Sequence, residues 1–326
     1  YLYKNNILVP SLNYIKWVKK NIHGYDVIHI HDYRNIYNLI IMHYARKYNI
    51  PYILQTHGGL PSNGKKKTLK ILYDVIFGRT LLSNASKILA LNKVEVDELN
   101  KRGINPSNII IIGNGLNKER YKNIPKKGYF KEKYQIKDKI ILYVGRIHQS
   151  KNLVTLIDAI KILSEKIKNV VLIFVGPDDN HQAELFTYSK KICINDKIVF
   201  LGYIDHDDKM AGFHDSEVFV TPSYSGFPIT FLESCIAKCP IITTNNELDW
   251  IDNQVGLVVK NSAYSVSEAI FQLLTKPDLV TKFKNNFNKI IDKYNNESIS
   301  KEILDNSNGT IIKGISKVNL SKIKIE

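Results

Sequence analysis

Two cations and a glycine follow one apolar segment in the second half of the chain. Ile140–Val144 runs directly into Gly145 and Arg146, and Lys151 comes five residues later. In parallel α/β sheets, ligands bind at the carboxyl ends of strands, where glycine lets the backbone turn. An arginine and a lysine beside the start of the next helix form a cradle suited to a diphosphate. Taken alone, the same residues could be two solvated cations on a surface loop.

A second loop is expected at the same edge of the sheet. The predicted strand Val218–Thr221 leads into a tight turn with Gly226 and Pro228, and Pro228 suits the first position of a helix. Glu233 then lies in the second turn of that helix, where a carboxylate could accept hydrogen bonds from a ribose diol. The simpler alternative is a surface glutamate that favours the helix dipole.

Histidines and cysteines offer two further candidate sites. His29 and His31 alternate along a predicted strand and therefore share one face, with Asp32 next. Such a pair could begin the site of a metal-dependent hydrolase, but the other histidines show no ligand-like spacing, so we expect no metal site. Cys235 and Cys239 are one helical turn apart, and packing against a sheet explains them better than catalysis.

Short apolar runs alternate with amphipathic stretches along most of the chain, which is typical of helices packed on a parallel sheet. The first part contains four predicted strands: Val27–His31, Tyr52–Thr56, Lys87–Leu91 and Ile109–Ile112. Its predicted helices are Ile36–Tyr48, Lys66–Leu82 and Val94–Arg102. The second part contains six predicted strands: Ile140–Val144, Val170–Val175, Ile198–Leu201, Val218–Thr221, Ile241–Thr244 and Leu257–Val259. We therefore expect an α/β protein with two doubly wound domains.

The expected domain limits follow from these elements. They are an N-terminal domain at 1–118, a polar linker at 119–138, a second domain at 139–296, and a C-terminal helix and tail at 297–326. We expect a helix over Ile299–Leu304 and poor order from Asn306 onward. Four strands against six predict that the first sheet is incomplete, and about 60–90 further residues would supply the missing βαβ units.

Composition limits the classes of function. The chain has 326 residues and a formal net charge of +15, from 46 basic and 31 acidic side chains. The excess suggests an anionic partner, such as a phosphorylated substrate or an acidic membrane surface, although a biased genome would give the same composition. Nucleic acid is not expected, because no helix combines arginines with interleaved aromatic residues. No apolar run is long enough to span a membrane, and three cysteines fit a reducing, cytoplasmic compartment.

In their order and spacing, the motifs resemble those of the retaining GT-B glycosyltransferases of family 4. The resemblance extends from about Asp26 to about Leu304 and depends on eight segments: Val27-Ile28-His29-Ile30-His31, Thr56-His57-Gly58, Asn114-Gly115, Gly145-Arg146 with Lys151, Gly176-Pro177-Asp178, Phe200-Leu201-Gly202, Gly226-Phe227-Pro228 and Leu232-Glu233. It implies two Rossmann-like domains that face a cleft. It also implies transfer of a hexose-type sugar, with retention, from a UDP-, GDP- or ADP-sugar to a glycan or lipid-linked acceptor. Cell-surface polysaccharide synthesis in the cytoplasm or at the inner membrane face would be the setting.

The resemblance also implies roles for individual residues. His57, Arg146 and Lys151 would be catalytic, with His57 near the transferred sugar and the two cations on the diphosphate, and no metal would be required. The donor-binding residues would be Asn114, Gly145, Arg146, Lys151, Ser225, Gly226, Phe227, Pro228, Ile229, Thr230 and Glu233.

One position departs from the family pattern. The family has a first acidic residue eight positions before the one that matches Glu233, and Ser225 stands there. The departure leaves open a nucleotide-sugar-binding module without transfer activity. A GT-B sugar-nucleotide epimerase is another alternative, although it would need acidic residues in the cleft.

Overall fold

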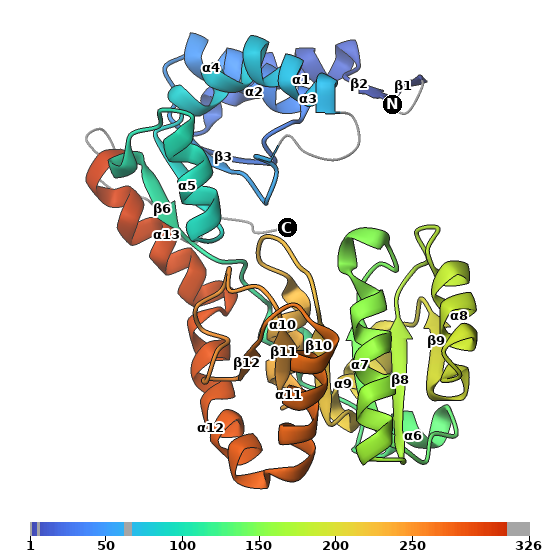
Figure 1. Cartoon of the computed structure of the whole chain (residues 1–326). Coiled ribbons are helices and arrows are strands. Elements are labelled where there is room, and N and C mark those ends of the chain that lie inside the picture. The colour runs from blue at the N-terminus through green and yellow to red at the C-terminus, as the bar shows by residue number, and fades with distance from the viewer. Residues whose placement is uncertain (1, 5–6, 62–66, 312–326) are drawn as a thin grey trace. The chain divides into compact units, whose positions relative to one another are not determined.

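The computed structural model describes residues 2–4, 7–61 and 67–311 (Figure 1). The chain divides into two compact units. Unit 1 comprises residues up to Gly113 together with the C-terminal segment from Ile299, and unit 2 is Asn114–Ser298. Both units have the predicted α/β organisation.

Unit 1 is built on a parallel sheet with the order β3-β4-β5-β6. Its strands are β3 (Ile28–His31), β4 (Tyr52–Gln55), β5 (Lys87–Ala90) and β6 (Ile109–Ile111). All four coincide with predicted strands. Every residue of β4 is buried, as expected for a strand that is covered on both faces. A short antiparallel hairpin, β1 (Leu2–Lys4) with β2 (Ile7–Val9), precedes the sheet and was not predicted.

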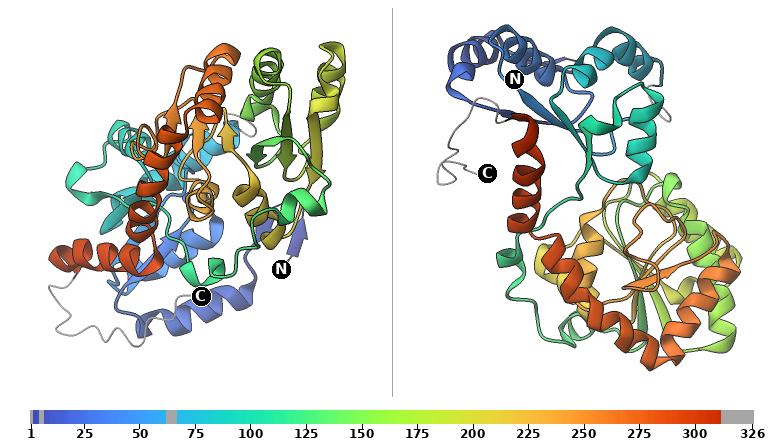
Figure 2. Two further views of the ribbon diagram at one scale, coloured as in Figure 1. Left: turned by 90° about the horizontal axis from the view of Figure 1, so that it is seen from below. Right: turned by 90° about the vertical axis from the view of Figure 1, so that its left-hand side faces the viewer.

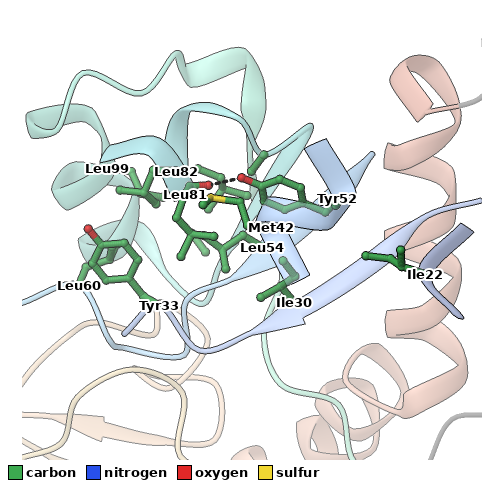
Figure 3. Packing of buried hydrophobic residues seen from close by; sticks show 14 of the residues in the cluster. Ile22, Ile30, Tyr33, Met42, Tyr52, Leu54, Leu60, Leu81, Leu82 and Leu99 are labelled. Carbon is green, nitrogen blue, oxygen red and sulfur yellow. Dashed lines mark hydrogen bonds between the residues drawn. The ribbon is translucent and has the colours of Figure 1, made fainter. Parts of the chain in front are cut away.

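The helical segments of unit 1 are α1 (Leu12–Asn21), α2 (Ile36–Lys47), α3 (Lys67–Tyr73), the π-helical turn η2 (Asp74–Gly78), α4 (Arg79–Ser83), α5 (Lys93–Lys101) and α13 (Asn296–Ile311), the last of which begins in unit 2. Buried residues of α1, α2, α4 and α5 form one apolar cluster with the strands. Short 3₁₀ turns lie at Ile22–Gly24 and Pro106–Asn108. Figure 3 shows the cluster, in which the Tyr52 hydroxyl donates a hydrogen bond of 2.6 Å to the carbonyl of Leu81.

The edge strand of unit 1 borders an apolar hollow. Within the described ranges, β3 pairs on one side only, with β4. Beside it, Trp17 and Tyr25 are 57% and 52% exposed, and both line a hollow of about 270 Å³ that also includes Val27 and His29. The expectation that further strands belong beside this sheet stays a prediction.

Unit 2 has a six-stranded parallel sheet with the order β12-β11-β10-β7-β8-β9. The strands are β7 (Lys139–Val144), β8 (Val170–Val175), β9 (Ile198–Gly202), β10 (Val218–Thr221), β11 (Ile241–Thr243) and β12 (Gly256–Val258). The helices are α6 (Tyr129–Lys133), α7 (Leu153–Lys166), α8 (Gln182–Lys191), α9 (His206–Asp215), α10 (Ile229–Ile236), α11 (Ala263–Thr275) and α12 (Pro277–Lys293). Three 3₁₀ turns lie at Lys118–Tyr121, Gln149–Lys151 and Asn195–Lys197. The six strands match the predicted ones within two residues at each end.

The segment expected as a linker, 119–138, packs instead as part of unit 2. Phe130 of α6 is fully buried. The carboxylate of Asp215 accepts hydrogen bonds from the backbone N–H groups of Gly128, Phe130 (2.8 Å) and Lys131 (3.1 Å). A buried aromatic ring and a capping carboxylate from α9 therefore hold this polar stretch in place.

The C-terminal helix is longer than the sequence predicted. α13 begins at Asn296 and runs to Ile311, past Asn306, where a poorly ordered tail was expected to start. The rest of that tail lies outside the described residues. Among the described residues, no helix is both long enough and apolar enough to cross a membrane.

Candidate functional site

Three loops of unit 2 leave the same edge of its sheet. β7, β10 and β11 are parallel, and β10 lies between the other two. The segments that follow Val144, Thr221 and Thr243 therefore emerge together at the carboxyl edge. This arrangement brings the predicted cations of the β7 loop beside the Gly226 turn of the β10 loop.

Close contact between two glycines sets the path of the β7 loop. A Cβ atom on Gly176 would lie only 2.1 Å from the carbonyl oxygen of Gly145, so no larger residue fits there. The backbone of Ile147 then donates to Pro177 and accepts from Asp179, both at 2.9 Å. The loop that carries Arg146 is thus fixed to the loop after β8.

Arg146 and Lys151 lie close enough to interact electrostatically. The Arg146 side chain is 61% exposed and pairs with Asp179, with 2.8 Å between Nη1 and Oδ2. Lys151 is more enclosed. Its burial lowers the pKa of the ammonium, the charge of Arg146 lowers it further, and the charge of Glu247 opposes this. An anion bound between the two cations would relieve their repulsion and favour the charged form of Lys151.

Glu247, which the sequence analysis missed, joins the two loops. Its Oε2 accepts a hydrogen bond of 3.0 Å from the N–H of Gly226, and its Oε1 accepts one of 3.1 Å from the amide of Asn245. The hydroxyl of Tyr224 accepts a hydrogen bond of 3.1 Å from the N–H of Glu247. The negative charge of the same carboxylate also favours the charged form of Lys151. Glu247 therefore lies near both the Gly226 turn and the lysine ammonium.

The turn after β10 leads into α10 as predicted, with a shift of one residue. Pro228 is the residue that precedes the helix, and Ile229 and Thr230 begin it, so Pro228 is not in the first helical position. Among the residues that the structure describes, no side chain caps this helix start. The amide of Asn114 donates a hydrogen bond of 2.8 Å to the carbonyl of Phe227, so this predicted donor-binding residue lies against the turn.

The turn combines buried and exposed side chains. The ring of Phe227 is buried, with its centroid 5.8 Å from that of Trp250 and 4.9 Å from that of Tyr294. Ser225, two residues before it, is exposed. The hydroxyl of Ser225 is therefore accessible to a ligand at this turn.

Glu233 is buried and paired. Its Oε1 accepts hydrogen bonds from the ammonium of Lys209 at 2.6 Å and from the hydroxyl of Tyr121 at 3.1 Å. Burial, and then the nearby carboxylate of Glu233, raise the pKa of Tyr121. The alternative of an exposed glutamate on a helix surface is therefore wrong. Both contacts use one oxygen, and a carboxylate has lone pairs for further donors on the other.

A second candidate cluster lies in unit 1, at the carboxyl ends of β3 and β4. His31 Nδ1 lies 2.8 Å from His57 Nε2, and their rings stack with centroids 5.1 Å apart. The ring of His29 lies 4.2 Å from that of His31. The predicted catalytic histidine is therefore one of three neighbouring imidazoles.

These imidazoles are held in their neutral forms. Burial lowers the pKa of His29 to about 4, with added repulsion from His31 and His57. Burial is also the main cause that lowers the pKa of His31 and of His57. Near pH 7, one ring nitrogen of the His31–His57 pair donates and the other accepts.

A buried carboxylate that the sequence analysis missed anchors the loop of His57. Glu95 accepts hydrogen bonds from the N–H of Gly58 and, at 2.7 Å, from that of Leu91. Glu95 lies on α5, and the side chain of Asn92 caps the start of this helix by accepting a hydrogen bond of 3.0 Å from the N–H of Glu95. The sequence signal was present, since an asparagine followed three residues later by a glutamate resembles a capping box.

The histidines do not form a metal site with other ligands. Within the part of the chain that the structure describes, no group of three or more His, Cys, Asp or Glu side chains is arranged to hold a metal ion. Cys235 and Cys239 are both fully buried, and burial raises the pKa of each thiol, to about 12 for Cys239. Their placement agrees with the expected packing role.

Comparison with known proteins identifies the family. Residues 126–290 match the family Glycosyl transferases group 1, and residues 2–120 match Glycosyltransferase Family 4. The chain belongs to the group 1 glycosyl transferases. The two matches meet near the boundary between the two units.

The relatives of this chain agree with that assignment. An Escherichia coli UDP-Gal:alpha-D-GlcNAc-diphosphoundecaprenol alpha-1,3-galactosyltransferase is 25% identical over 295 residues, which are 83% of this chain and 72% of that protein. An uncharacterized glycosyltransferase of Methanocaldococcus jannaschii is 26% identical over 224 residues, or 66% of this chain and 56% of that protein. The chain thus spans little more than half of the archaeal relative.

Solved structures confirm the GT-B fold. Anabaena HepE, crystallised with UDP and glucose, gives a TM-score of 0.75 at 15% identity and covers 90% of this chain and 81% of its own. Sucrose-phosphate synthase of Thermosynechococcus elongatus gives 0.70 at 20% identity, with 93% and 80% covered.

The structure gathers most of the predicted site residues in one place. The β7 and β10 loops, the start of α10 and Asn114 all belong to unit 2 and meet at the carboxyl edge of its sheet. His57 belongs to unit 1, and its expected position in a cleft stays a prediction.

Proposed function

We propose that this chain transfers a hexose-type sugar from a nucleotide-sugar donor to a glycan or lipid-linked acceptor, with retention at the anomeric carbon. The observation that carries the proposal is that two cations, the exposed Arg146 and the half-buried Lys151, lie near each other at the carboxyl edge of the unit 2 sheet. Two cations beside an uncapped helix start suit a diphosphate, the leaving group of such a reaction.

In the proposed reaction the bond between the sugar and the diphosphate breaks, and a bond from the sugar to the acceptor oxygen forms. The acceptor hydroxyl gives its proton to the departing phosphate. Arg146 would leave its ion pair with Asp179 and bind a phosphate oxygen instead. Lys151 is already partly desolvated, so its binding to the anion would cost little further desolvation. Preorganised charges of this kind lower the barrier most where negative charge develops. Because these groups supply the positive charge, we propose that no metal is required.

Names of relatives support the acceptor class. The Escherichia coli relative is named for a diphosphoundecaprenol acceptor, and so is a Campylobacter jejuni N-acetylgalactosaminyltransferase that is 26% identical over 211 residues. A Staphylococcus aureus relative, 25% identical over 235 residues, is named for capsular polysaccharide biosynthesis. We propose a saccharide linked to a polyprenyl diphosphate as the acceptor, and action in the cytoplasm at the inner membrane face.

One observation favours a second candidate function. Ser225 is exposed at the position where the family pattern has an acidic residue, so the donor sugar would lack that carboxylate. The second candidate is a protein that binds nucleotide-sugars without transferring them.

A single experiment separates the two candidates. The full chain is incubated with UDP-, GDP- and ADP-sugars, with and without a lipid-linked saccharide and with EDTA present, and the free nucleoside diphosphate and the anomeric configuration of the product are measured. Acceptor-dependent release with a retained configuration supports the transferase. Donor binding without release supports the binding module, and absence of binding to every donor contradicts both.

A further inference from the structure

One carboxylate lies close to the cations of the site in unit 2. Glu247 follows β11, and its charge acts on the ammonium of Lys151, on which Arg146 also acts. The two cations suit a diphosphate, but a carboxylate beside a diphosphate weakens its binding because like charges repel. Binding of a diphosphate therefore does not explain the presence of Glu247.

The carboxylate of Glu247 is held in a fixed position. It accepts hydrogen bonds from the N–H of Gly226 at 3.0 Å and from the amide of Asn245 at 3.1 Å. The same amide donates to the carbonyl of Tyr224 at 2.8 Å. The hydroxyl of Tyr224 accepts from the N–H groups of Glu247 and Leu248, both at 3.1 Å. Because β10 and β11 are neighbours in the sheet (Figure 2, gold to orange), contacts between their loops place the carboxylate before any ligand binds.

The turn after β10 obtains a carboxylate from this neighbouring loop. Between Pro222 and Pro228 the chain contains no acidic residue. Ser225 is exposed, the N–H of the next residue, Gly226, donates to Glu247, and the side chain of Glu247 is only partly buried. An ionised carboxylate accepts hydrogen bonds and donates none, so the ligand group that suits it is a hydroxyl.

A nucleotide-sugar carries hydroxyls on both sides of its diphosphate, on the ribose and on the transferred sugar. Glu233, which pairs with Lys209, is the residue expected to bind the ribose. Glu247 has different neighbours, namely Gly226 and Lys151. The transferred sugar, on the other side of the diphosphate, is therefore the part of the donor that suits Glu247.

We propose that Glu247 selects the donor sugar, since it binds hydroxyls of a neutral hexose and excludes hexuronic acids. The inference rests on the proposed function, because it assigns one part of the donor to a residue of that site. A neutral hexose offers hydroxyl donors to the carboxylate. A hexuronic acid would bring a second carboxylate beside the first, where it is repelled and forms no hydrogen bond.

Titrations with matched ligands test the proposal. The full chain is titrated with three series, each of which contains a nucleoside diphosphate, its neutral nucleotide-sugar and the corresponding uronic acid. The series are UDP, UDP-glucose and UDP-glucuronic acid; GDP, GDP-mannose and GDP-mannuronic acid; and ADP, ADP-glucose and ADP-glucuronic acid. In the series that binds, the wild type should prefer the neutral sugar over the uronic acid at least tenfold.

Glu247→Gln keeps the shape of the side chain and removes its charge. It should weaken binding of the neutral nucleotide-sugar about tenfold, which is the difference between a hydrogen bond to a charged group and one to a neutral group. The nucleoside diphosphate should bind equally well or more tightly, because a nearby negative charge is gone. The preference against the uronic acid should fall below threefold. A residue with a merely structural role would weaken all three ligands alike.

Further variants separate the effect of charge from the effect on the fold. Glu217→Gln makes the same change in charge on an exposed residue at the amino end of β10, and every affinity should stay within threefold of the wild type. Ser225→Glu, added to Glu247→Gln, returns a carboxylate to the turn and should restore the preference for the neutral sugar. Thermal melting shows whether each variant is folded. If Glu247→Gln melts early, Ser225→Lys replaces it, because a cation at this exposed position offsets the charge of Glu247 and should raise the relative affinity for the uronic acid.

The outcomes distinguish failure of the inference from failure of the proposed function. Equal binding of the neutral sugar and the uronic acid by the wild type would overturn the inference and leave the donor site in place. Equal losses for all three ligands in Glu247→Gln would do the same. Absence of binding to every ligand of the three series would contradict the proposed function, and the inference with it.

Discussion

At the residue scale, the site in unit 2 is an arrangement of charges whose partners we expect to change if an anion binds. Arg146 is paired with Asp179, and Lys151 experiences repulsion from Arg146 and attraction from Glu247. None of these contacts is deeply buried, so exchange of partners costs little desolvation. Such a set can bind a diphosphate and release it again.

Removal of Arg146 should weaken binding of the donor directly. Arg146→Ala is expected to reduce the affinity for a nucleoside diphosphate by about 1.5–3 kcal/mol, the worth of charge-assisted hydrogen bonds. Isothermal titration of the full chain measures the effect. Asp179→Asn is the matched control, because it deletes the partner of Arg146 and leaves the cation, so affinity should stay equal or rise. Weaker binding by both variants would mean that the ion pair is structural.

Glu233 requires a comparison between two variants, because its carboxylate also stabilises the fold. Glu233→Gln removes the ion pair with Lys209 and should destabilise unit 2 by about 1–3 kcal/mol. Lys209→Met removes the same pair and keeps the carboxylate. If the carboxylate binds a ribose, Glu233→Gln should weaken nucleotide binding at least tenfold more than Lys209→Met does. Equal losses in titrations of the two variants would leave Glu233 with a structural role only.

The histidine cluster predicts how stability depends on pH. The pKa of His29 is about 4 in the folded chain, against 6.5 ordinarily, so the unfolded chain binds more protons between these values. The contribution of His29 to the free energy of unfolding is therefore fully present above pH 6.5, and it decreases as the pH falls toward 4. Because the ring is partly exposed, we expect a loss on the order of 1 kcal/mol. The melting temperature of His29→Gln should decline less over this range, and an identical decline would contradict the assignment.

At the element scale, the sequence predicted best what local patterns encode. The ten parallel strands were found because continuous apolar runs such as Val170–Val175 are bounded by turn residues. The hairpin β1–β2 was missed because its two short strands stand outside the alternation of strands and helices, which was the pattern that located equally short strands such as β6. Ser11, which caps α1 through the N–H of Tyr14 at 3.2 Å, was a usable signal that was overlooked.

Which candidate site residues the sequence could suggest depended on where they lie relative to the strands. Gly145 and Arg146 follow β7 directly and Gly226 lies in the loop after β10, so the topology of the sheet places them. Glu247 lies beyond β11 in a segment with no family motif, and its contact with Gly226 spans 21 residues. The linker at 119–138 was misread because its polar composition hides Phe130, which is fully buried and whose N–H donates to Asp215, 85 residues further along the chain.

The anchoring of that segment can be tested at this scale. Asp215→Ala deletes the acceptor of three backbone N–H groups around α6 and should destabilise unit 2 by about 2–4 kcal/mol. Glu165→Ala, on the exposed side of α7, should change stability by less than about 0.5 kcal/mol. Chemical denaturation monitored by circular dichroism measures both. A free linker would leave Asp215→Ala as stable as the control.

At the scale of the whole molecule, two units with separate cores should unfold as two transitions. The predicted donor contacts, apart from His57, belong to unit 2, so a bound nucleotide-sugar should stabilise that unit selectively. The chain has two tryptophans, one in each unit: Trp17 is 57% exposed in unit 1, and Trp250 is buried in unit 2 beside Phe227. The variant Trp17→Phe therefore reports on unit 2 alone by fluorescence, and Trp250→Phe reports on unit 1.

This design tests donor binding without any acceptor. A ligand present at about a hundred times its dissociation constant adds about 2.7 kcal/mol to the stability of the unit that binds it. For a unit of this size, that corresponds to a rise in melting temperature of about 5–10 °C. We expect the rise in the Trp17→Phe variant with one of UDP-, GDP- or ADP-sugar, and a rise below about 1 °C in Trp250→Phe. Equal rises in both variants would show that the units unfold together, and no rise with any donor would contradict the assignment of the donor site to unit 2.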